Sequence, residues 1–78
     1  MHFIGVQKDI LSEREKTRKV IIKEQRRLWT YVSLHQEFAE NQQVQKVNTL
    51  IEKKLRYPFL EATDAIEIYL KIDAVVNP

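Results

Sequence analysis

The feature that most constrains the fold is a stretch of about 28 residues, Ser12 to Ala39, that contains neither glycine nor proline. When its residues are spaced at 100° around a helix axis, the apolar side chains gather on one side and a group of basic side chains on the other. The stretch therefore predicts one long amphipathic helix, which with its end occupies residues 12–40. Its apolar side consists of Val20, Ile21, Leu28, Tyr31, Val32, His35, Phe38 and Ala39.

Ser12 marks the predicted start of this helix, because Ser12 and Glu15 match the S-x-x-E capping box. In that motif the hydroxyl accepts a hydrogen bond from the backbone amide three residues later, and the glutamate reaches back to the serine amide. Residues 1–11 then form an N-terminal arm, which is compatible with a strand, a helical turn or a segment that docks on a neighbour. The alternative is one continuous helix from about Val6, with Ser12 exposed within it.

Two further helical segments follow the long helix. Asparagine tolerates the left-handed conformation at the end of a helix and also serves as the N-cap of a following helix. We therefore place the first reversal at Glu40 and Asn41. A second helix is predicted over residues 42–57, with apolar positions at helical spacing. Pro58 interrupts it, because proline has no amide hydrogen and restricts the residue before it. Residues 58–76 form either a third helix or a kinked continuation, since proline is also favoured in the first turn of a helix. The apolar positions of the second helix are Val44, Val47, Ile51 and Leu55.

Residues 66–72 carry a second pattern, because apolar and polar side chains alternate there as in a half-buried strand. Such a strand could pair with one at residues 2–6. We favour a helix, since Pro58 suits a helix start and no tight turn separates Leu60 from Ala65. The apolar residues that form a helical face here are Phe59, Ala62, Ile66, Tyr69, Leu70 and Val76.

The predicted fold class is all-α, and two arrangements of the helices are open. A full reversal at Pro58 gives a three-helix antiparallel bundle, in which the second helix reaches back only to about residue 25. A kink instead gives a long helical hairpin with residues 42–76 as one arm. Charge favours the hairpin, because residues 14–27 carry a formal charge of +5 and residues 61–73 a charge of −3, and the two would face each other. Exposed ion pairs contribute at most about 1 kcal/mol each, so they select the register more than they stabilise the fold.

A chain of 78 residues folds as one domain with a small core, and no cysteine is present to staple it. Ile22 and Trp29, seven residues apart, widen the apolar side of the long helix beyond what one neighbouring helix covers. We therefore expect a homodimer or another helical partner, with a helical bundle as the assembly. The predicted function is a non-enzymatic protein–protein interaction or regulatory module. Its expected interface is Ile22, Leu28, Trp29, Val32, Ile66 and Tyr69.

The alternative function is binding of nucleic acid by the basic side of the long helix. The basic residues on this side extend over about 16 Å of helix, which matches the length of two or three successive phosphates, and Trp29 lies beside them. The simpler interpretation is a solvated helix face, balanced in part by Glu15, Glu24 and the acidic third segment. The possible nucleic-acid contacts are Lys16, Lys19, Lys23, Arg26 and Arg27.

Two polar residues fall on apolar helix faces. His35 lies on the apolar side of the long helix without a second metal-binding side chain four residues away, so we expect a packing role. Asp73 lies on the apolar side of the third segment, where it either pairs with a base such as Lys8 or Arg14 or is exposed at a frayed helix end.

The residues give little support to other classes of function. With no cysteine and only two histidines, His2 and His35, we expect neither a metal nor a cofactor. Neither Ser12 nor Ser33 has a histidine and an acid nearby, and no glycine-rich phosphate loop is present, so we expect no enzyme activity and no small-molecule substrate. No apolar run exceeds three residues, so no segment is expected to span a membrane, and we expect a cytoplasmic protein.

Overall fold

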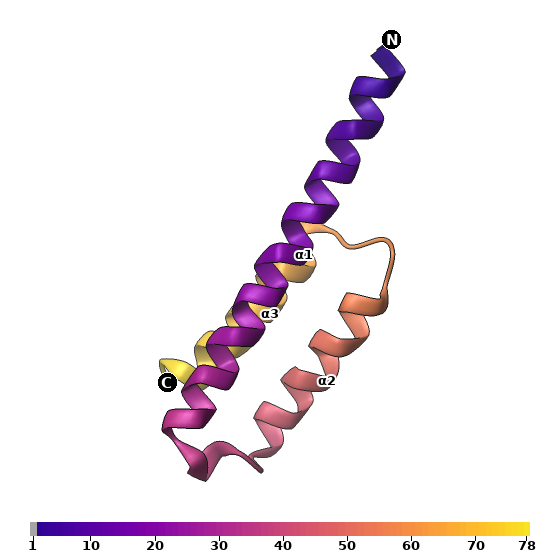
Figure 1. Ribbon diagram of the computed structural model, residues 1–78. Helices are drawn as coiled ribbons and strands as arrows, with labels where there is room; N and C mark the ends of the chain where they lie inside the picture. The colour runs from indigo at the N-terminus through magenta and orange to yellow at the C-terminus, as the bar shows by residue number, and fades with distance from the viewer. Residues whose placement is uncertain (1) are drawn as a thin grey trace.

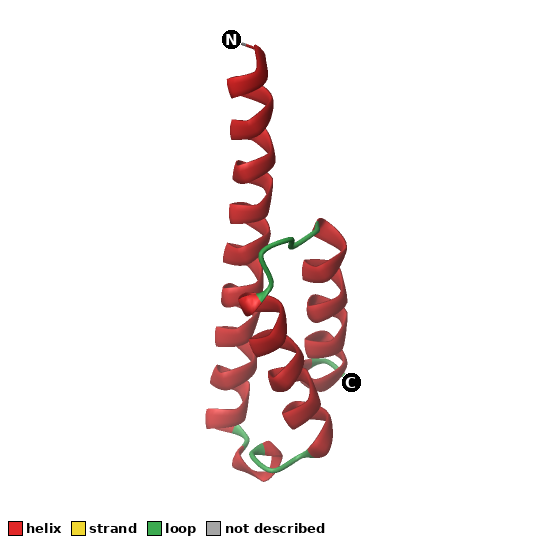
Figure 2. Cartoon of the chain, turned by 90° about the vertical axis from the view of Figure 1, so that its right-hand side faces the viewer, coloured by secondary structure: helices red, strands yellow, loops and turns green. Residues whose placement is uncertain are grey.

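The computed structural model describes residues 2–78, and side chains from Glu13 onward. Three α-helices follow one another: α1 (His2–Leu34), α2 (Gln42–Arg56) and α3 (Ala62–Val76), with a short 3-10 helix η1 (Gln36–Phe38) between α1 and α2 (Figure 1). None of residues 2–78 forms a strand, which confirms the all-α prediction (Figure 2). Residues 66–72 lie within α3, so the strand interpretation of that segment is wrong.

Helix α1 differs from the predicted long helix at both ends. The helix already includes residues 2–11, which were predicted as a separate arm, so Ser12 lies inside the helix and does not cap it. At the other end α1 stops at Leu34, because the backbone of His35 leaves the helical region with φ −132° and ψ 73°. The first reversal therefore occupies residues 35–41 and begins earlier than Glu40.

Helix α2 has the bounds that its sequence signals indicate. Asn41 is its N-cap: the side-chain Oδ1 accepts hydrogen bonds from the backbone amides of Gln43 at 2.8 Å and Val44 at 3.2 Å. These bonds satisfy two of the amides that a helix start leaves unpaired. Lys53, Lys54 and Arg56 lie in the last turn, where positive charge complements the helix dipole.

The chain reverses fully between α2 and α3, around Pro58. Helix α3 begins at Ala62, four residues later than predicted, because Glu61 acts as its N-cap. The backbone amide of Glu61 donates to Oδ2 of Asp64 at 2.8 Å, which anchors the first turn. Residues 42–76 are therefore two helices joined by a loop, and the single arm that the charge argument favours is not formed.

Side-chain contacts define how the helices run relative to one another. Arg18 of α1 donates to the backbone oxygen of Leu55 near the end of α2, so α1 and α2 are antiparallel. Arg27 of α1 contacts Asp73 of α3, 46 positions later, and Arg14 lies near Phe59, so α1 and α3 are parallel. With 33 residues against 15 in each of the others, α1 extends beyond the loop that joins α2 to α3 (Figure 1).

One apolar core lies between the three helices. Each helix contributes two large side chains that are completely buried, and smaller buried residues surround them. Removing apolar side chains from water is the main contribution to stability in such a bundle. The six fully buried side chains are Ile21 and Leu28 of α1, Val44 and Ile51 of α2, and Ile68 and Ile72 of α3.

Candidate interaction surfaces

The six residues predicted to form one partner interface lie in three different places. Leu28 and Val32 are buried in the core of the chain's own bundle, with 0% and 6% exposure, and are not available to a partner. Trp29 is 39% exposed on α1. Ile66 and Tyr69 are exposed on α3.

Trp29 and Tyr69 belong to separate surfaces. The guanidinium of Arg27 lies 5.3 Å from the ring centroid of Tyr69, so the Arg27 side of α1 faces α3. Trp29 follows Arg27 by two residues, which places it about 200° further around α1. Ile22 precedes Trp29 by seven residues and therefore shares its side of the helix.

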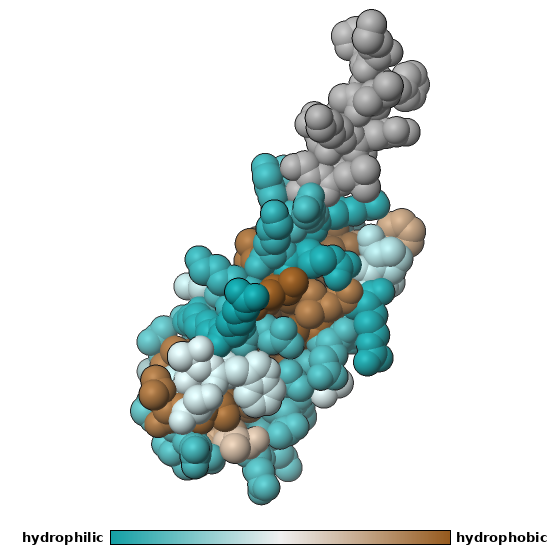
Figure 3. Space-filling model, viewed as in Figure 1, coloured by the Kyte–Doolittle hydropathy of each residue, from teal (hydrophilic) through white to brown (hydrophobic). Residues whose placement is uncertain are grey.

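Helix α3 exposes an apolar surface, which we call the α3 outer face: Ile66, Tyr69 and Leu70, with Val20 of α1 beside them. Ile66 and Leu70 are each more than half exposed. The offset of 46 positions between Arg27 and Asp73 places Val20 level with Ile66, and Val20 shares the α3-facing side of α1 because it precedes Arg27 by two helical turns. Hydrophobic side chains, drawn brown, interrupt the polar surface of the molecule in the view of Figure 3.

The helical face predicted for this segment contains Ile66, Tyr69 and Leu70, and two of these, Ile66 and Tyr69, were expected to meet a partner. The core instead takes Ala65, Ile68, Ile72 and Val75, while Ile66 and Leu70 point away from it. Periodicity does not separate the two sides, because α3 is apolar around most of its circumference. A helix of that kind is normally covered by protein on more than one side.

A charged cluster joins α1 to α3 next to this face. Arg27 donates to Oε1 of Glu24 at 2.7 Å and to Oδ1 of Asp73 at 2.8 Å, and Asn77 also donates to Asp73 at 2.9 Å. The hydrogen bonds from Asn77 and Arg27 lower the pKa of Asp73, and the bond to Asp73 raises the pKa of Arg27. The partner of Asp73 is therefore Arg27 and not Arg14, while the predicted alternative Lys8 lies outside the side chains that the structure describes.

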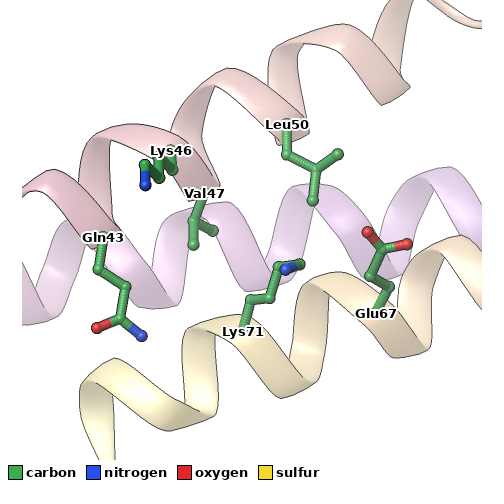
Figure 4. A pocket seen from close by; sticks show the side chains of 6 residues that line it. All are labelled: Gln43, Lys46, Val47, Leu50, Glu67 and Lys71. Atoms are coloured by element: carbon green, nitrogen blue, oxygen red, sulfur yellow. The ribbon is translucent and has the colours of Figure 1, made fainter.

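A groove runs between α2 and α3, and Figure 4 shows the side chains that line it. Val47 and Leu50 of α2 form its apolar floor, while Glu67 and Lys71 rise from α3 on its other side. Among the described side chains, neither Glu67 nor Lys71 lies within ion-pair distance of a partner. These two charges are four residues apart, one helical turn, on the flank of the α3 outer face.

A second ion pair joins α2 to α3. Lys54 Nζ donates to Oδ1 of Asp64 at 2.6 Å. This bond, together with the one from the backbone amide of Glu61, lowers the pKa of Asp64, and the same contact raises the pKa of Lys54. Asp64 is thus engaged by a cation outside the predicted basic group, whereas Asp73 is engaged by Arg27, a member of that group.

Four of the five predicted nucleic-acid contacts form a continuous strip, which we call the basic strip: Lys16, Lys19, Lys23 and Arg26. All four are exposed. The fifth, Arg27, is held by Glu24 and Asp73 and points to α3. Arg26 and Trp29 line a shallow depression together with Gln25, Thr30 and Ser33.

His35 packs against Tyr31 but is not buried on the apolar side of the helix. Its side chain is 48% exposed at the first reversal, where its ring lies 4.5 Å from that of Tyr31 and Nδ1 lies 3.7 Å from Glu37. From Glu13 onward, no three histidine, aspartate or glutamate side chains come together as a metal site would require. Of the helices in the described part of the chain, none has the length and apolar content needed to cross a bilayer.

Comparisons with known proteins return no relative. The chain matches no protein-family model, no curated protein and no solved structure.

Proposed function

We propose that this protein is a helical interaction module that acts by pairing with a second copy of itself through the α3 outer face. The observation that carries the proposal is the exposure of Ile66 and Leu70, at 57% and 59%, on a helix whose opposite side already fills the core. Two large aliphatic side chains one turn apart, with Tyr69 and Val20 beside them, form a continuous apolar surface of the kind that marks interaction sites.

A second helix suits the shape of this surface. Ile66 and Leu70 are spaced by four residues and Ala62 and Ala74 extend the row by one turn in each direction, so the apolar strip runs along the helix axis. A neighbouring helix buries such a strip by inserting its own side chains between these residues. The small side chains of Ala62 and Ala74 at the ends allow close approach.

The charges beside the strip favour a second copy in antiparallel orientation. When two α3 helices pair antiparallel about Tyr69, facing positions sum to 138, so Glu67 of each copy faces Lys71 of the other. The same register brings Ile66 of one copy within two positions, about 3 Å along the axis, of Leu70 of the other. A twofold axis makes both pairs equivalent, and flanking charges of this kind set the orientation of paired helices.

The expected assembly is a weak dimer. Each copy offers four large apolar side chains that are already about half buried, so the gain on pairing is limited against the cost of association. We expect a dissociation constant on the order of micromolar.

Charge reversal tests this proposal without disturbing the core, because Glu67 and Lys71 are exposed. In sedimentation velocity over a concentration series, Glu67→Lys and Lys71→Glu each weaken the dimer roughly tenfold, since each places like charges opposite one another twice. The double variant Glu67→Lys/Lys71→Glu restores the dissociation constant of the wild-type dimer. Glu52→Lys, an exposed charge reversal on α2, is the matched control and leaves the dissociation constant of the dimer unchanged.

Two results would reject the pairing. One is a wild-type chain that stays monomeric across the micromolar range. The other is a dimer whose dissociation constant in the two single variants equals that of the wild type, because association would then use another surface.

A further inference from the structure

We propose that the basic strip of α1, together with Trp29, binds single-stranded nucleic acid. This site adjoins the α3 outer face at Val20, which follows Lys16 by four residues, and it does not depend on dimer formation. The four cations of the strip, Lys16, Lys19, Lys23 and Arg26, are exposed on the side of α1 turned away from the other two helices.

The geometry of the strip suits a phosphate backbone. Its residues follow one another at intervals of three, four and three, so they lie in one line along the helix. From Lys16 to Arg26 the line covers about 15 Å, because each residue adds about 1.5 Å. A row of cations of that length contacts about two or three phosphates and releases the counterions that surround them.

The fold leaves these cations available. The acidic residues of α3 were expected to neutralise them, but Asp64 is bound by Lys54 and Asp73 by Arg27. Glu24 is buried beside Arg27, with 7% exposure. Considering the side chains from Glu13 onward, Lys19 is the one member of the strip near an acid, and its distance to Glu15 is 3.9 Å with both side chains mostly exposed.

Trp29 indicates a single strand. Its indole is 39% exposed one turn after Arg26, and both line the depression with Gln25, Thr30 and Ser33. An exposed indole next to a guanidinium stacks on unpaired bases, which a duplex keeps within its own stack. The polar side chains around the depression suit base edges better than the acyl chains of a membrane.

Binding is measured with a fluorescein-labelled oligothymidylate by anisotropy, at low salt and then at rising salt, with Trp29 fluorescence as a second signal. Trp29 is the only tryptophan of the chain, so its quenching reports stacking at this position. We expect the logarithm of the association constant to fall with the logarithm of the salt concentration at a slope of about −2, as about three phosphate contacts on a single strand require. We expect weaker binding to a duplex of the same length and none to vesicles of phosphatidylserine and phosphatidylcholine.

Variants locate the site. Lys23→Glu/Arg26→Glu abolishes binding, whereas Lys46→Glu/Lys53→Glu, which reverses two exposed lysines of α2, reduces it less than threefold. Trp29→Leu weakens oligothymidylate binding roughly tenfold and leaves duplex binding unchanged. Leu70→Ser, which changes only the α3 outer face, binds as the wild type does.

Four results would overturn this inference. The first is the absence of an anisotropy change at low salt, and the second is an equal loss of binding in the α1 variant Lys23→Glu/Arg26→Glu and the α2 variant Lys46→Glu/Lys53→Glu. The third is duplex binding as tight as single-strand binding, and the fourth is preferential binding to the vesicles. Leu70→Ser separates the two proposals, because failure of the dimer leaves nucleic-acid binding intact and failure of nucleic-acid binding leaves the dimer intact.

Discussion

Arg27 of α1 donates to Asp73 of α3 at 2.8 Å, and this contact fixes the parallel register of the two helices. It also determines which surfaces remain for partners, since it removes Arg27 from the basic strip and places its guanidinium over Tyr69. Both side chains are partly exposed, at 28% and 37%, so the pair contributes more to register than to stability.

The link between Arg27 and Asp73 is tested by a double-mutant cycle. We expect Arg27→Ala and Asp73→Ala each to lower the urea midpoint, because each removes the charged hydrogen bond between α1 and α3. The double variant loses less than the two single losses combined, since the shared contact is removed only once. Strictly additive losses would show that the two side chains do not interact in solution.

The N-cap of α2 gives a second prediction. Asn41→Ala removes the acceptor for the amides of Gln43 and Val44 and should lower the free energy of unfolding by about 1 kcal/mol. Asn41→Asp keeps an acceptor at the same place and should stay within about 0.5 kcal/mol of wild type. Equal losses of unfolding free energy in the two variants, measured by urea denaturation, would show that capping by this side chain is unimportant.

Core packing gives a third prediction. Ile68 is completely buried, so Ile68→Val should cost about 0.5–1.5 kcal/mol through the lost methylene group and the space it leaves. Leu34→Ala is the matched control, because Leu34 is 76% exposed, and it should change stability by less than about 0.5 kcal/mol. If the exposed position proved the more costly one, Ile68 would not lie in the core in solution.

Acid pH gives a fourth prediction, through Asp64. Lys54 and the Glu61 amide hold its pKa below the ordinary value of 3.8, so its ionised form stabilises the fold fully above that value. This stabilisation is lost as the pH falls from about 4 through the lowered pKa. We expect wild type to lose more stability between about pH 5 and pH 2 than Asp64→Asn, which has no carboxylate to protonate; equal losses would contradict the pairing with Lys54.

The second helix could be predicted closely because its signals are local. Asn41 caps its start, the apolar spacing continues through it, and Pro58 follows its end. The long helix could not be bounded in this way. The Ser12–Glu15 pattern resembles a start signal, yet no residue before it forces the backbone out of the helix, and no glycine or proline marks the end at Leu34.

The side of α3 that enters the core could not be predicted from its own pattern. Ile66 and Leu70 fit a packed face as well as Ile68 and Ile72 do, and only contacts with α1 and α2 select between them. The same applies to the charges. The pairing of Asp73 with Arg27 depends on the full reversal at Pro58, so the sequence argument, which assumed a hairpin, placed the acidic segment against the wrong part of α1.

The predicted interface was divided for a related reason. Leu28 and Val32 stand on the most apolar side of α1, and that side fills the chain's own core. Burial within one chain and burial between chains favour the same residue types, so composition alone does not distinguish them. The exposed members of the predicted interface, Trp29, Ile66 and Tyr69, became distinguishable only once the three helices were placed.

The pairing of two α3 helices is tested most directly by cross-linking single-cysteine variants, which is straightforward because the chain has no cysteine of its own. Thr63 and Ala74 are both exposed, and in the antiparallel register, where facing positions sum to about 138, Thr63 of one copy lies next to Ala74 of the other. Two Thr63 residues, or two Ala74 residues, then lie about 15–18 Å apart along the helix axis.

We expect a short bis-maleimide reagent to link Thr63→Cys to Ala74→Cys in an equimolar mixture, and to link neither variant to itself. Cross-linked dimers of Thr63→Cys alone, or no cross-linking in the mixture at concentrations where the chain sediments as a dimer, would contradict the antiparallel pairing of α3.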